Sequence, residues 1–255
     1  MNIRPLLARM KLVRAHLFLS LLVLPAALGC ETVFAQHNVS KRYPASKNVR
    51  VELKNISGTI TVESWNKDEV KISASMETPK ANFAPRVVGN DVVVDLMGDN
   101  RGRGDIGDVN FKIYVPANSS VDLETKRGNI TVNEIRGGLV RAHVTTEGDI
   151  VLNGINASQV LAQNTIGNIH FDGEFSRGGT YHFQSTKGDI SIRIPADSAF
   201  RLVAAAPTKQ ITLGQFWNNG FKNLGDGRKF VGDVGDGRSS VMVTTFQGSI
   251  TFLRR

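Results

Sequence analysis

Apolar and polar residues alternate along short segments of this chain, and many of these segments begin at one recurring motif. The motif is a glycine, a small or polar residue and an isoleucine, with a second apolar residue two positions later. It occurs six times, starting at Gly58, Gly128, Gly148, Gly167, Gly188 and Gly248. Alternation with a period of two residues is typical of a β-strand that buries one face. Each copy therefore predicts a turn followed by a half-buried strand.

A second strand is predicted before the turn of each repeat. The four middle glycines are separated by 20, 19 and 21 residues, and a fixed period of this length marks a repeat architecture. The preceding strands are expected at 121–124, 139–144, 159–162, 180–183, 200–203 and 241–243. One unit is therefore a strand, a turn, a strand and a corner, in about 20 residues.

Stacking of such units predicts an all-β protein with one repeat domain, a β-solenoid of about 20-residue rungs. Neighbouring units would lie about 4.8 Å apart, and the isoleucines would form a buried ladder. A two-sheet β-sandwich with a repetitive core is the alternative. Lys209 replaces the glycine in a further copy of the motif at 209–213, which predicts a different turn there. Residues 91–96 and 109–115 predict two more strands.

The first 35 residues predict a secretory signal. Basic residues lie between Arg4 and Arg14, and the apolar segment 17–28 is too short for a comfortable transmembrane helix. Cleavage after Ala35 and lipidation of Cys30 in a lipobox-like sequence are both compatible with this segment. The expected organisation is a signal peptide at 1–35, or at 1–29 for a lipoprotein, a linker at 36–46 and the repeat domain at 47–255.

Cysteine usage and charge constrain the class of partner. No cysteine follows Cys30, so we expect no internal disulfide in the mature chain. The formal charge of +8 falls to +5 without residues 1–35, and Lys and Arg are scattered rather than clustered. We therefore expect no nucleic-acid partner and no transmembrane span. The expected location is the periplasm, the outer membrane or the cell surface, with an envelope polymer or protein as partner. The oligomeric state is left open.

Two carboxylates occupy equivalent positions of the repeat. Asp149 and Asp189 each follow a turn glycine, and Asn168 occupies the same position in the unit between them. In a stack they would lie two units apart, about 9–10 Å, which approaches the spacing of an inverting glycosidase pair. Asp and Asn beside a turn glycine also need no catalytic reason. We therefore favour a turn role for both residues and keep catalysis as the alternative.

Other motifs fall in loops or are scattered. Residues 102–107 fit the letters of a dinucleotide-binding glycine motif, but a strand at 109–115 follows where such a site needs a helix. The same loop contains Arg103-Gly104-Asp105, a tripeptide that some integrins bind, which we attribute to chance. The histidines of the mature chain take unrelated positions in the unit: His37, His143, His170 and His182. We predict no catalytic, cofactor-binding or metal-binding residue.

A segment rich in glycine and aromatic residues interrupts the repeat at 215–240. Its aromatic residues are Phe216, Trp217, Phe221 and Phe230, set among Gly, Asn and Asp. Exposed sheet edges invite aggregation, so aromatic residues that cover an open end would protect the stack. We predict that this segment is a cap, with a contact surface as the alternative.

Two stretches resemble a known family. The first runs from Val51 to Val62 and continues from Ser64 to Val70, and the second runs from Gly232 to Gly237 and through Gly248 to Phe252. They are similar to the bacterial family named "putative adhesin", β-strand-repeat proteins of unknown function, and the resemblance covers about residues 47–255. It implies an exported or envelope-associated protein. The family has no established activity or catalytic residue, so none is carried over.

Together these observations favour a non-enzymatic, exported cell-envelope protein, an adhesin-like scaffold for contacts with a surface, a polymer or a protein. One alternative is a carbohydrate-active β-helix enzyme, a polysaccharide lyase or hydrolase, that uses Asp149 and Asp189. A second alternative is a structural or sensory accessory protein anchored by a lipid at Cys30.

Overall fold

The computed structural model describes residues 37–77, 80–218 and 220–255. The described residues all belong to one compact unit, Ala35–Arg255. The predicted signal segment and Cys30 lie outside the described residues. Within the described part, no helix has both the length and the apolar character needed to cross a membrane.

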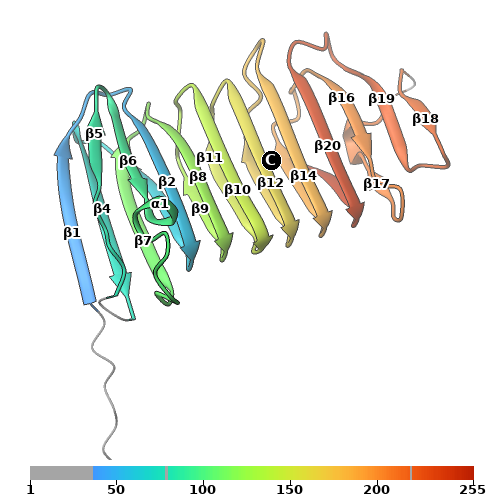
Figure 1. Ribbon diagram of the computed structural model, residues 1–255. Coiled ribbons are helices and arrows are strands. Elements are labelled where there is room, and N and C mark those ends of the chain that lie inside the picture. The colour runs from blue at the N-terminus through green and yellow to red at the C-terminus, as the bar shows by residue number, and fades with distance from the viewer. Residues whose placement is uncertain (1–36, 78–79, 219) are drawn as a thin grey trace, which may run out of the picture. The chain divides into compact units, whose positions relative to one another are not determined.

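Nearly all regular structure lies in two large sheets, whose strands run side by side in Figure 1. Sheet A contains, in spatial order, β1 (His37–Pro44), β4 (Glu69–Met76), β7 (Val109–Pro116), β3 (Ile60–Trp65), β9 (Ile130–Asn133), β11 (Ile150–Ile155), β13 (Ile169–Gly173), β15 (Ile190–Ile194), β21 (Ile250–Arg254) and β17 (Ile211–Thr212). The two helical segments described are short, α1 (Leu96–Asp99) and the 3-10 turn η1 (Gly214–Phe216).

Sheet B contains, in spatial order, β18 (Lys222–Leu224), β19 (Lys229–Val234), β16 (Phe200–Ala205), β20 (Ser240–Gln247), β14 (Thr180–Lys187), β12 (Gln159–Ile166), β10 (Leu139–Glu147), β8 (Ser120–Arg127), β2 (Arg50–Ser57), β6 (Asp91–Asp95) and β5 (Arg86–Val88). The all-β class is confirmed, and the two mixed sheets fit the two-sheet alternative.

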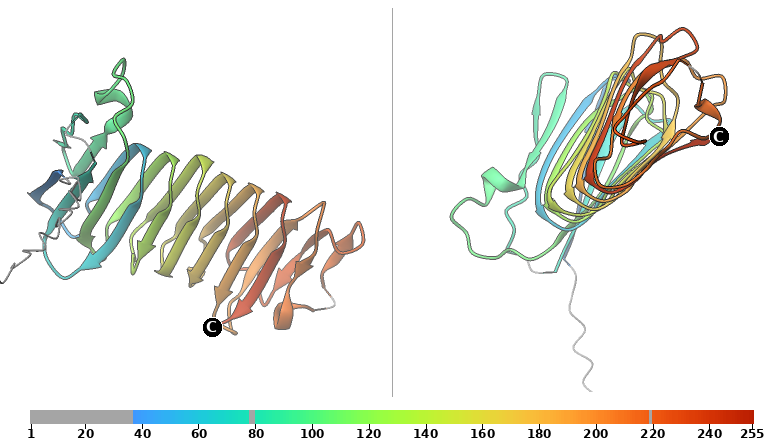
Figure 2. Two further views of the ribbon diagram at one scale, coloured as in Figure 1. Left: turned by 90° about the horizontal axis from the view of Figure 1, so that it is seen from below. Right: turned by 90° about the vertical axis from the view of Figure 1, so that its right-hand side faces the viewer.

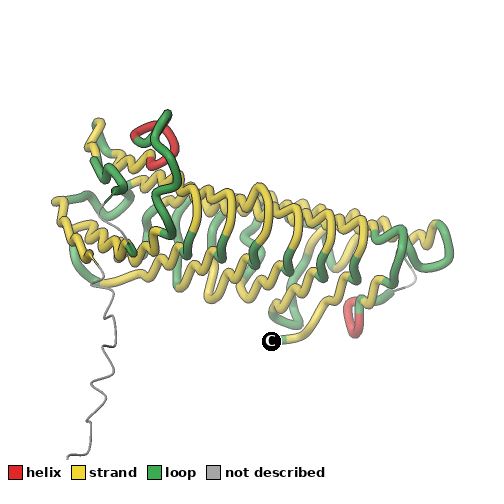
Figure 3. The backbone as a smooth tube through the Cα atoms, turned by 60° about the horizontal axis from the view of Figure 1, so that its bottom comes forward, coloured by secondary structure: helices red, strands yellow, loops and turns green. Residues whose placement is uncertain are grey.

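The chain passes from sheet B to sheet A through the glycine turn and returns through a corner, as Figures 2 and 3 show. We call one sheet B strand, its turn and the following sheet A strand a rung. Equivalent residues of neighbouring rungs are paired in register, with Ile150 opposite both Ile130 and Ile169. The pairing is parallel because each rung repeats the same path.

The order of the rungs in space departs from the order of the sequence at both ends. The spatial order is β6–β7, β2–β3, β8–β9, β10–β11, β12–β13, β14–β15, β20–β21 and β16–β17. The strands β20 and β21 therefore lie between two rungs that precede them in the chain. In the same way, β2 and β3 are covered by β6 and β7, which follow them.

The core lies between the two sheets and follows the predicted alternation. The repeat isoleucines Ile60, Ile130, Ile150, Ile169, Ile190 and Ile250 have 0–1% of their surface exposed. Burial of each stabilises the fold by about 1.5–3 kcal/mol. Towards the β16–β17 end the core becomes aromatic, because Phe183, Phe200 and Phe252 pack there among other rings. The predicted buried ladder is present.

Antiparallel strands cover the ends of the parallel stack. At one end β4 pairs with β7, β1 pairs with β4, and β5 pairs with β6. At the other end β19 pairs with β16, and β18 pairs with β19. The segment expected as a linker at 36–46 thus contains strand β1 over His37–Pro44, so the sheet begins before residue 47. Its polar sequence suits an edge strand, which is why it resembles a linker.

The aromatic insert at 215–240 lies at the β16–β17 end, where the cap prediction places it. It includes η1, β18 and β19. Phe216, Phe221 and Phe230 are buried, whereas Trp217 has 49% of its surface exposed. The buried rings pack against one another and against the aromatic core. The insert therefore extends the core over the last rung.

Candidate functional site

Asp149 and Asp189 belong to a ladder of hydrogen bonds along the glycine turns. The side-chain Oδ1 of Asp149 accepts the backbone N–H of Asn168 at 2.7 Å, and Oδ1 of Asn168 accepts the N–H of Asp189 at 2.9 Å. Oδ1 of Asp189 in turn accepts the N–H of Ser249 at 2.7 Å. Each side-chain oxygen thus accepts a hydrogen bond from a backbone N–H of the adjacent rung. Asn and Asp both carry such an acceptor oxygen.

The same geometry keeps the two candidate carboxylates apart. Asn168 lies between Asp149 and Asp189 in the ladder. The Nζ atom of Lys209 lies 3.9 Å from Oδ1 of Asp189, at a surface where both side chains are more than half exposed. The positions predicted as turn residues therefore have that role, and the structure does not bring the two carboxylates together around a cavity.

A second polar ladder lies inside the turn. The position three residues before each repeat glycine is polar, and at Asn164, Ser185 and Thr245 its side chain donates to the glycine carbonyl of a neighbouring rung. Asn164 Nδ2 donates to Gly148 O at 3.0 Å, and Thr245 Oγ1 donates to Gly188 O at 2.8 Å. Thr245 is fully buried. Buried carbonyl groups require such partners, so these polar residues stabilise the stack.

The four histidines of the described chain lie apart from one another. His143 and His182 are on strands β10 and β14 of sheet B, whereas His170 is on β13 of sheet A and His37 begins β1. Within the described ranges, no group of three or more His, Cys, Asp or Glu residues is placed to hold a metal ion. The four histidines therefore do not converge on one site.

The loop at 102–107 connects α1 to strand β7. Oδ1 of Asp105 accepts the N–H of Gly107 at 2.9 Å, and Ile106 is buried. Arg103 donates to the backbone oxygen of Lys80 at 3.3 Å. A strand follows this loop, so it lacks the helix N-terminus on which a dinucleotide site depends.

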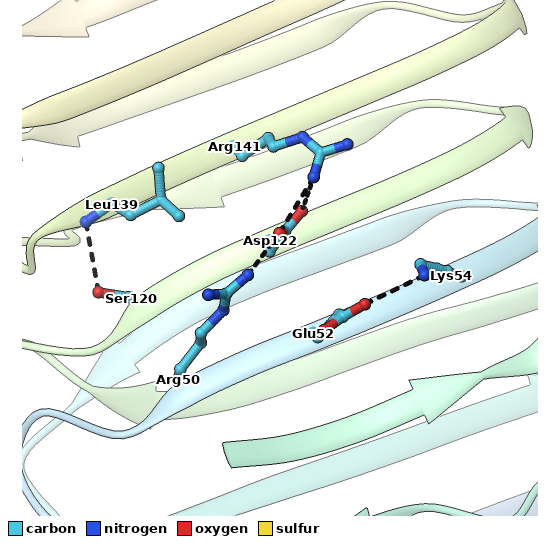
Figure 4. A network of polar contacts seen from close by, with 7 residues as sticks. All are labelled: Arg50, Glu52, Lys54, Ser120, Asp122, Leu139 and Arg141. Carbon is cyan, nitrogen blue, oxygen red and sulfur yellow. Dashed lines mark hydrogen bonds and ion pairs between the residues drawn. The ribbon is translucent and has the colours of Figure 1, made fainter. Parts of the chain in front are cut away.

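One charged cluster crosses sheet B near β2, β8 and β10, as Figure 4 shows. Asp122 has only 7% of its surface exposed and accepts from Arg50 at 2.8 Å. Arg141 of the next rung pairs with the same carboxylate at 3.1 Å. The two guanidinium groups compensate the buried charge. This cluster joins the neighbouring strands β2, β8 and β10, and we assign it a structural role.

The surface with binding chemistry lies on the outer face of sheet A, on β3, β4 and β7. The rings of Trp65 and Tyr114 are stacked, with centroids 5.2 Å apart and planes 23° apart. Lys67 Nζ lies 5.0 Å from the centre of the Trp65 ring, and Lys71 Nζ lies 5.8 Å from that of Tyr114. Lys112 Nζ is 5.2 Å from the Tyr114 ring. We call these five residues the aromatic–lysine surface.

Two further contacts set the geometry of the aromatic–lysine surface. Trp65 Nε1 donates to the backbone oxygen of Glu69 at 2.8 Å, which orients the indole ring. The pKa of the Lys112 ammonium is raised, first by a hydrogen bond with Tyr114 and also by Glu63. Lys112 therefore stays protonated across the physiological range.

Two hollows adjoin the aromatic–lysine surface. One, of about 260 Å³, is lined by Trp65 and Lys67 together with Lys47 and Asn118. The other, of about 350 Å³, is lined by the polar residues Ser40, Thr61, Ser73, Asn110 and Lys112, among others. Sequence reasoning missed this region. The available signal was that Tyr114 and Lys112 occupy outward positions of the alternating segment 109–115.

The sequence and the structure were compared with those of known proteins. No protein-family model and no curated protein matches the sequence. A putative cell adhesion protein from Clostridium sporogenes is similar in structure, with a TM-score of 0.53 at 13% identity, covering 86% of this chain and all of its own. A putative adhesin from Bacteroides fragilis has a TM-score of 0.40 at 11% identity, covering 85% of this chain and 97% of its own. At these identities the likeness concerns the fold alone. The resemblance to the "putative adhesin" family drawn from the sequence is thereby confirmed at the level of the fold.

Proposed function

We propose that this protein is an exported, non-enzymatic scaffold of the bacterial cell envelope that contacts a surface, a polymer or another protein. In this proposal the stacked rungs form a two-sided β-solenoid, and the outer faces of its sheets are the contact surfaces. Two features support it: the continuous parallel pairing of equivalent residues and the fold shared with a putative cell adhesion protein.

One observation carries the non-enzymatic part of the proposal. The repeated carboxylates and amides at the turns bind backbone N–H groups of adjacent rungs. Side chains that satisfy the backbone in this way are held at the turn and have a structural reason to be there. What the repeat offers to a partner is therefore the regular surface that it builds.

The proposal is tested by binding. The mature protein, labelled with a fluorophore, is mixed with bacterial envelope material and with the same amount of bovine serum albumin-coated beads. Saturable retention on envelope material, removed by an excess of unlabelled protein, is the expected result. Equal retention on the two surfaces would contradict a specific envelope contact.

The enzymatic alternative has its own test. A variant with Asp149→Asn and Asp189→Asn keeps the acceptor oxygens of the ladder, so it is expected to fold as the wild type does. Both proteins are screened for release of reducing ends or unsaturated products from a panel of glycans. We expect no turnover by either. Turnover by the wild type that the double variant lacks would establish the enzyme and overturn the proposal.

For the leader we propose export through residues 1–35, or lipidation of Cys30 after removal of 1–29. The two are separated by metabolic labelling with a fatty-acid analogue in cells that express the wild type or Cys30→Ser. Label on the wild type alone identifies the lipid-anchored form, and absence of label on both together with an N-terminus at Gln36 in mass spectrometry identifies cleavage after Ala35.

A further inference from the structure

We propose that the aromatic–lysine surface on sheet A, together with Lys47 of the adjoining smaller hollow, binds an acidic polysaccharide: the rings of Trp65 and Tyr114 contact the sugar, and Lys47, Lys67 and Lys71 bind its anionic groups. This inference rests on the proposed function as a polymer-contacting scaffold and names the class of polymer and the place where it binds.

The aromatic part of the surface is held in place before any ligand binds. Strands β3 and β7 are neighbours, with Glu63 opposite Tyr114 and Trp65 opposite Pro116. The stacked rings therefore project from adjacent strands of a sheet, and the indole is fixed by its bond to the Glu69 carbonyl. A rigid aromatic surface loses little entropy on binding, and C–H groups of a sugar can pack against the exposed parts of these rings, beside the lysines that lie over them.

The charges on this surface are partly uncompensated. Glu63 pairs with Lys112 at 3.4 Å, and Glu69 pairs with Arg42 at 3.4 Å. For Lys47, Lys67 and Lys71, no ion pair is found within the part of the chain that the structure describes. Asp68 also lines the smaller hollow, opposite two lysines, Lys47 and Lys67. A net positive charge beside an aromatic ring favours an anionic ligand with an apolar face.

The polar residues beyond the rings extend this surface. The larger hollow continues on the same side of the sheet from Lys112 to Asn110 and to the hydroxyl groups of Thr61 and Ser73. Along β7, the distance from Asn110 to Pro116 is about 20 Å at the usual rise of a strand. A row of amide, hydroxyl, ammonium and aromatic groups of this length suits an extended polyhydroxylated chain better than a small anion.

A lipid surface fits this face less well. The exposed large apolar side chains of the described residues are Val87, Val88, Ile166, Trp217, Leu224, Met242, Phe246 and Leu253. All of them lie away from the aromatic–lysine surface, so no large exposed apolar side chain is placed there to insert into a bilayer. An acidic polysaccharide is therefore the proposed ligand, and the test below includes membrane binding as a result that would contradict it.

The test measures the affinity of the mature protein for polygalacturonate, alginate and heparin, with neutral dextran, phosphatidylglycerol vesicles and a single-stranded oligonucleotide as other probes. We expect binding to at least one acidic polysaccharide, weakened by salt, and none to dextran. The double variant Lys47→Glu and Lys67→Glu is expected to lose at least tenfold in affinity. Lys222→Glu with Lys229→Glu, the same charge change on exposed residues of β18 and β19, is the matched control and should bind as the wild type does.

The aromatic contact is tested separately, because Trp65 is partly buried. Trp65→Ala should lose affinity, and Trp65→Phe should restore part of it, while thermal melting shows that both are folded. Wild-type affinity in the lysine variant, an equal loss in the control variant, or binding confined to vesicles or the oligonucleotide would overturn the inference. Retention on envelope material without binding to any acidic polysaccharide would also overturn it, yet leave the proposed function in place.

Discussion

Each repeated glycine lies with its α-carbon against a carbonyl group of the adjacent rung. A Cβ atom at Gly148 would lie 2.1 Å from the oxygen of Gly128, and one at Gly188 would lie 1.8 Å from the oxygen of Gly167. Both distances are far below van der Waals contact, and the clash is with backbone that cannot move without breaking the pairing. Close approach of the backbones therefore requires glycine at this point of the repeat.

We expect Gly148→Ala to lower the free energy of unfolding by about 3 kcal/mol or more, because the methyl group must push two rungs apart. Urea denaturation followed by circular dichroism measures the change. Gly104→Ala is the matched control, since a methyl group there would meet nothing within 4 Å and the φ of Gly104 is not positive. A loss of equal size in the control would contradict the role of the close approach.

The polar residue after the glycine is expected to matter through its acceptor oxygen. Asn168→Asp keeps that oxygen and should change stability little, whereas Asn168→Ala leaves the N–H of Asp189 without its partner. The loss expected for alanine is about 1 kcal/mol, measured as a shift of the urea midpoint. Equal stability of the two variants would show that the ladder contributes nothing.

An ion pair between β16 and β19 gives a prediction for pH. The Arg201 guanidinium, which donates to Asp233 at 2.8 Å, holds the pKa of that carboxyl below its ordinary value of 3.8. The pair therefore stabilises the fold fully above that ordinary value, and this contribution is lost as the pH falls through the lowered pKa. An NMR titration should find the pKa of Asp233 below 3.8 in the wild type and close to it in Arg201→Gln.

At the scale of elements, the two strands of a rung contribute differently sized side chains to one core. At β14 a large ring replaces small residues: Phe183 occupies the position that Ala162 and Ala142 occupy in the paired strands. The ring of Phe183 packs against that of Phe171, with centroids 5.1 Å apart. Loss of one such ring leaves a cavity that β-sheet pairing prevents from closing.

Phe183→Ala is expected to cost about 3–5 kcal/mol of unfolding free energy. Phe246→Ala makes the same chemical change on a side chain that is 56% exposed, and it should stay within about 0.5 kcal/mol of the wild type. Chemical denaturation of both variants under the same conditions provides the comparison. Similar losses would mean that the ring at residue 183 is not part of the packed core.

The sequence was sufficient to predict the middle rungs, because Gly128, Gly148, Gly167 and Gly188 mark turns in which local pattern and long-range pairing agree. It was insufficient at the ends. Strand β1 has no buried residue in its eight positions, so no apolar pattern distinguishes it from a linker. The site was missed for a related reason: Trp65 and Tyr114 are distant in the sequence, and only the pairing of β3 with β7 brings them together.

At the scale of the whole described unit, chain order and spatial order differ at both ends of the stack. Strands β20 and β21 fill the space between β14–β15 and β16–β17 and pair on both sides. The repeat period in the sequence predicts the strands and the turn of each rung. It does not predict which rungs are neighbours in space. The positions of these strands are therefore visible only in the pairing of the folded chain.

A variant that ends at residue 239 is expected to lose cooperative unfolding, because four strands lose a parallel neighbour at once. A variant without residues 37–44 removes only the edge strand β1, whose single partner is β4, and should melt cooperatively at a lower temperature. Thermal melting and size-exclusion chromatography distinguish the two outcomes. A cooperative, monomeric protein ending at residue 239 would contradict the role given to β20 and β21.

The inserted position of β20 and β21 also restricts the order in which the strands can pair during folding. As the chain emerges from its N-terminus, β14 to β17 appear before the strands that separate them, so the stack cannot close progressively behind the emerging chain. Polypeptides interrupted before residue 240 would present unpaired parallel strand edges, which are targets for proteases and for aggregation. The aromatic end therefore closes only once residues 240–254 have taken their place between the two rungs.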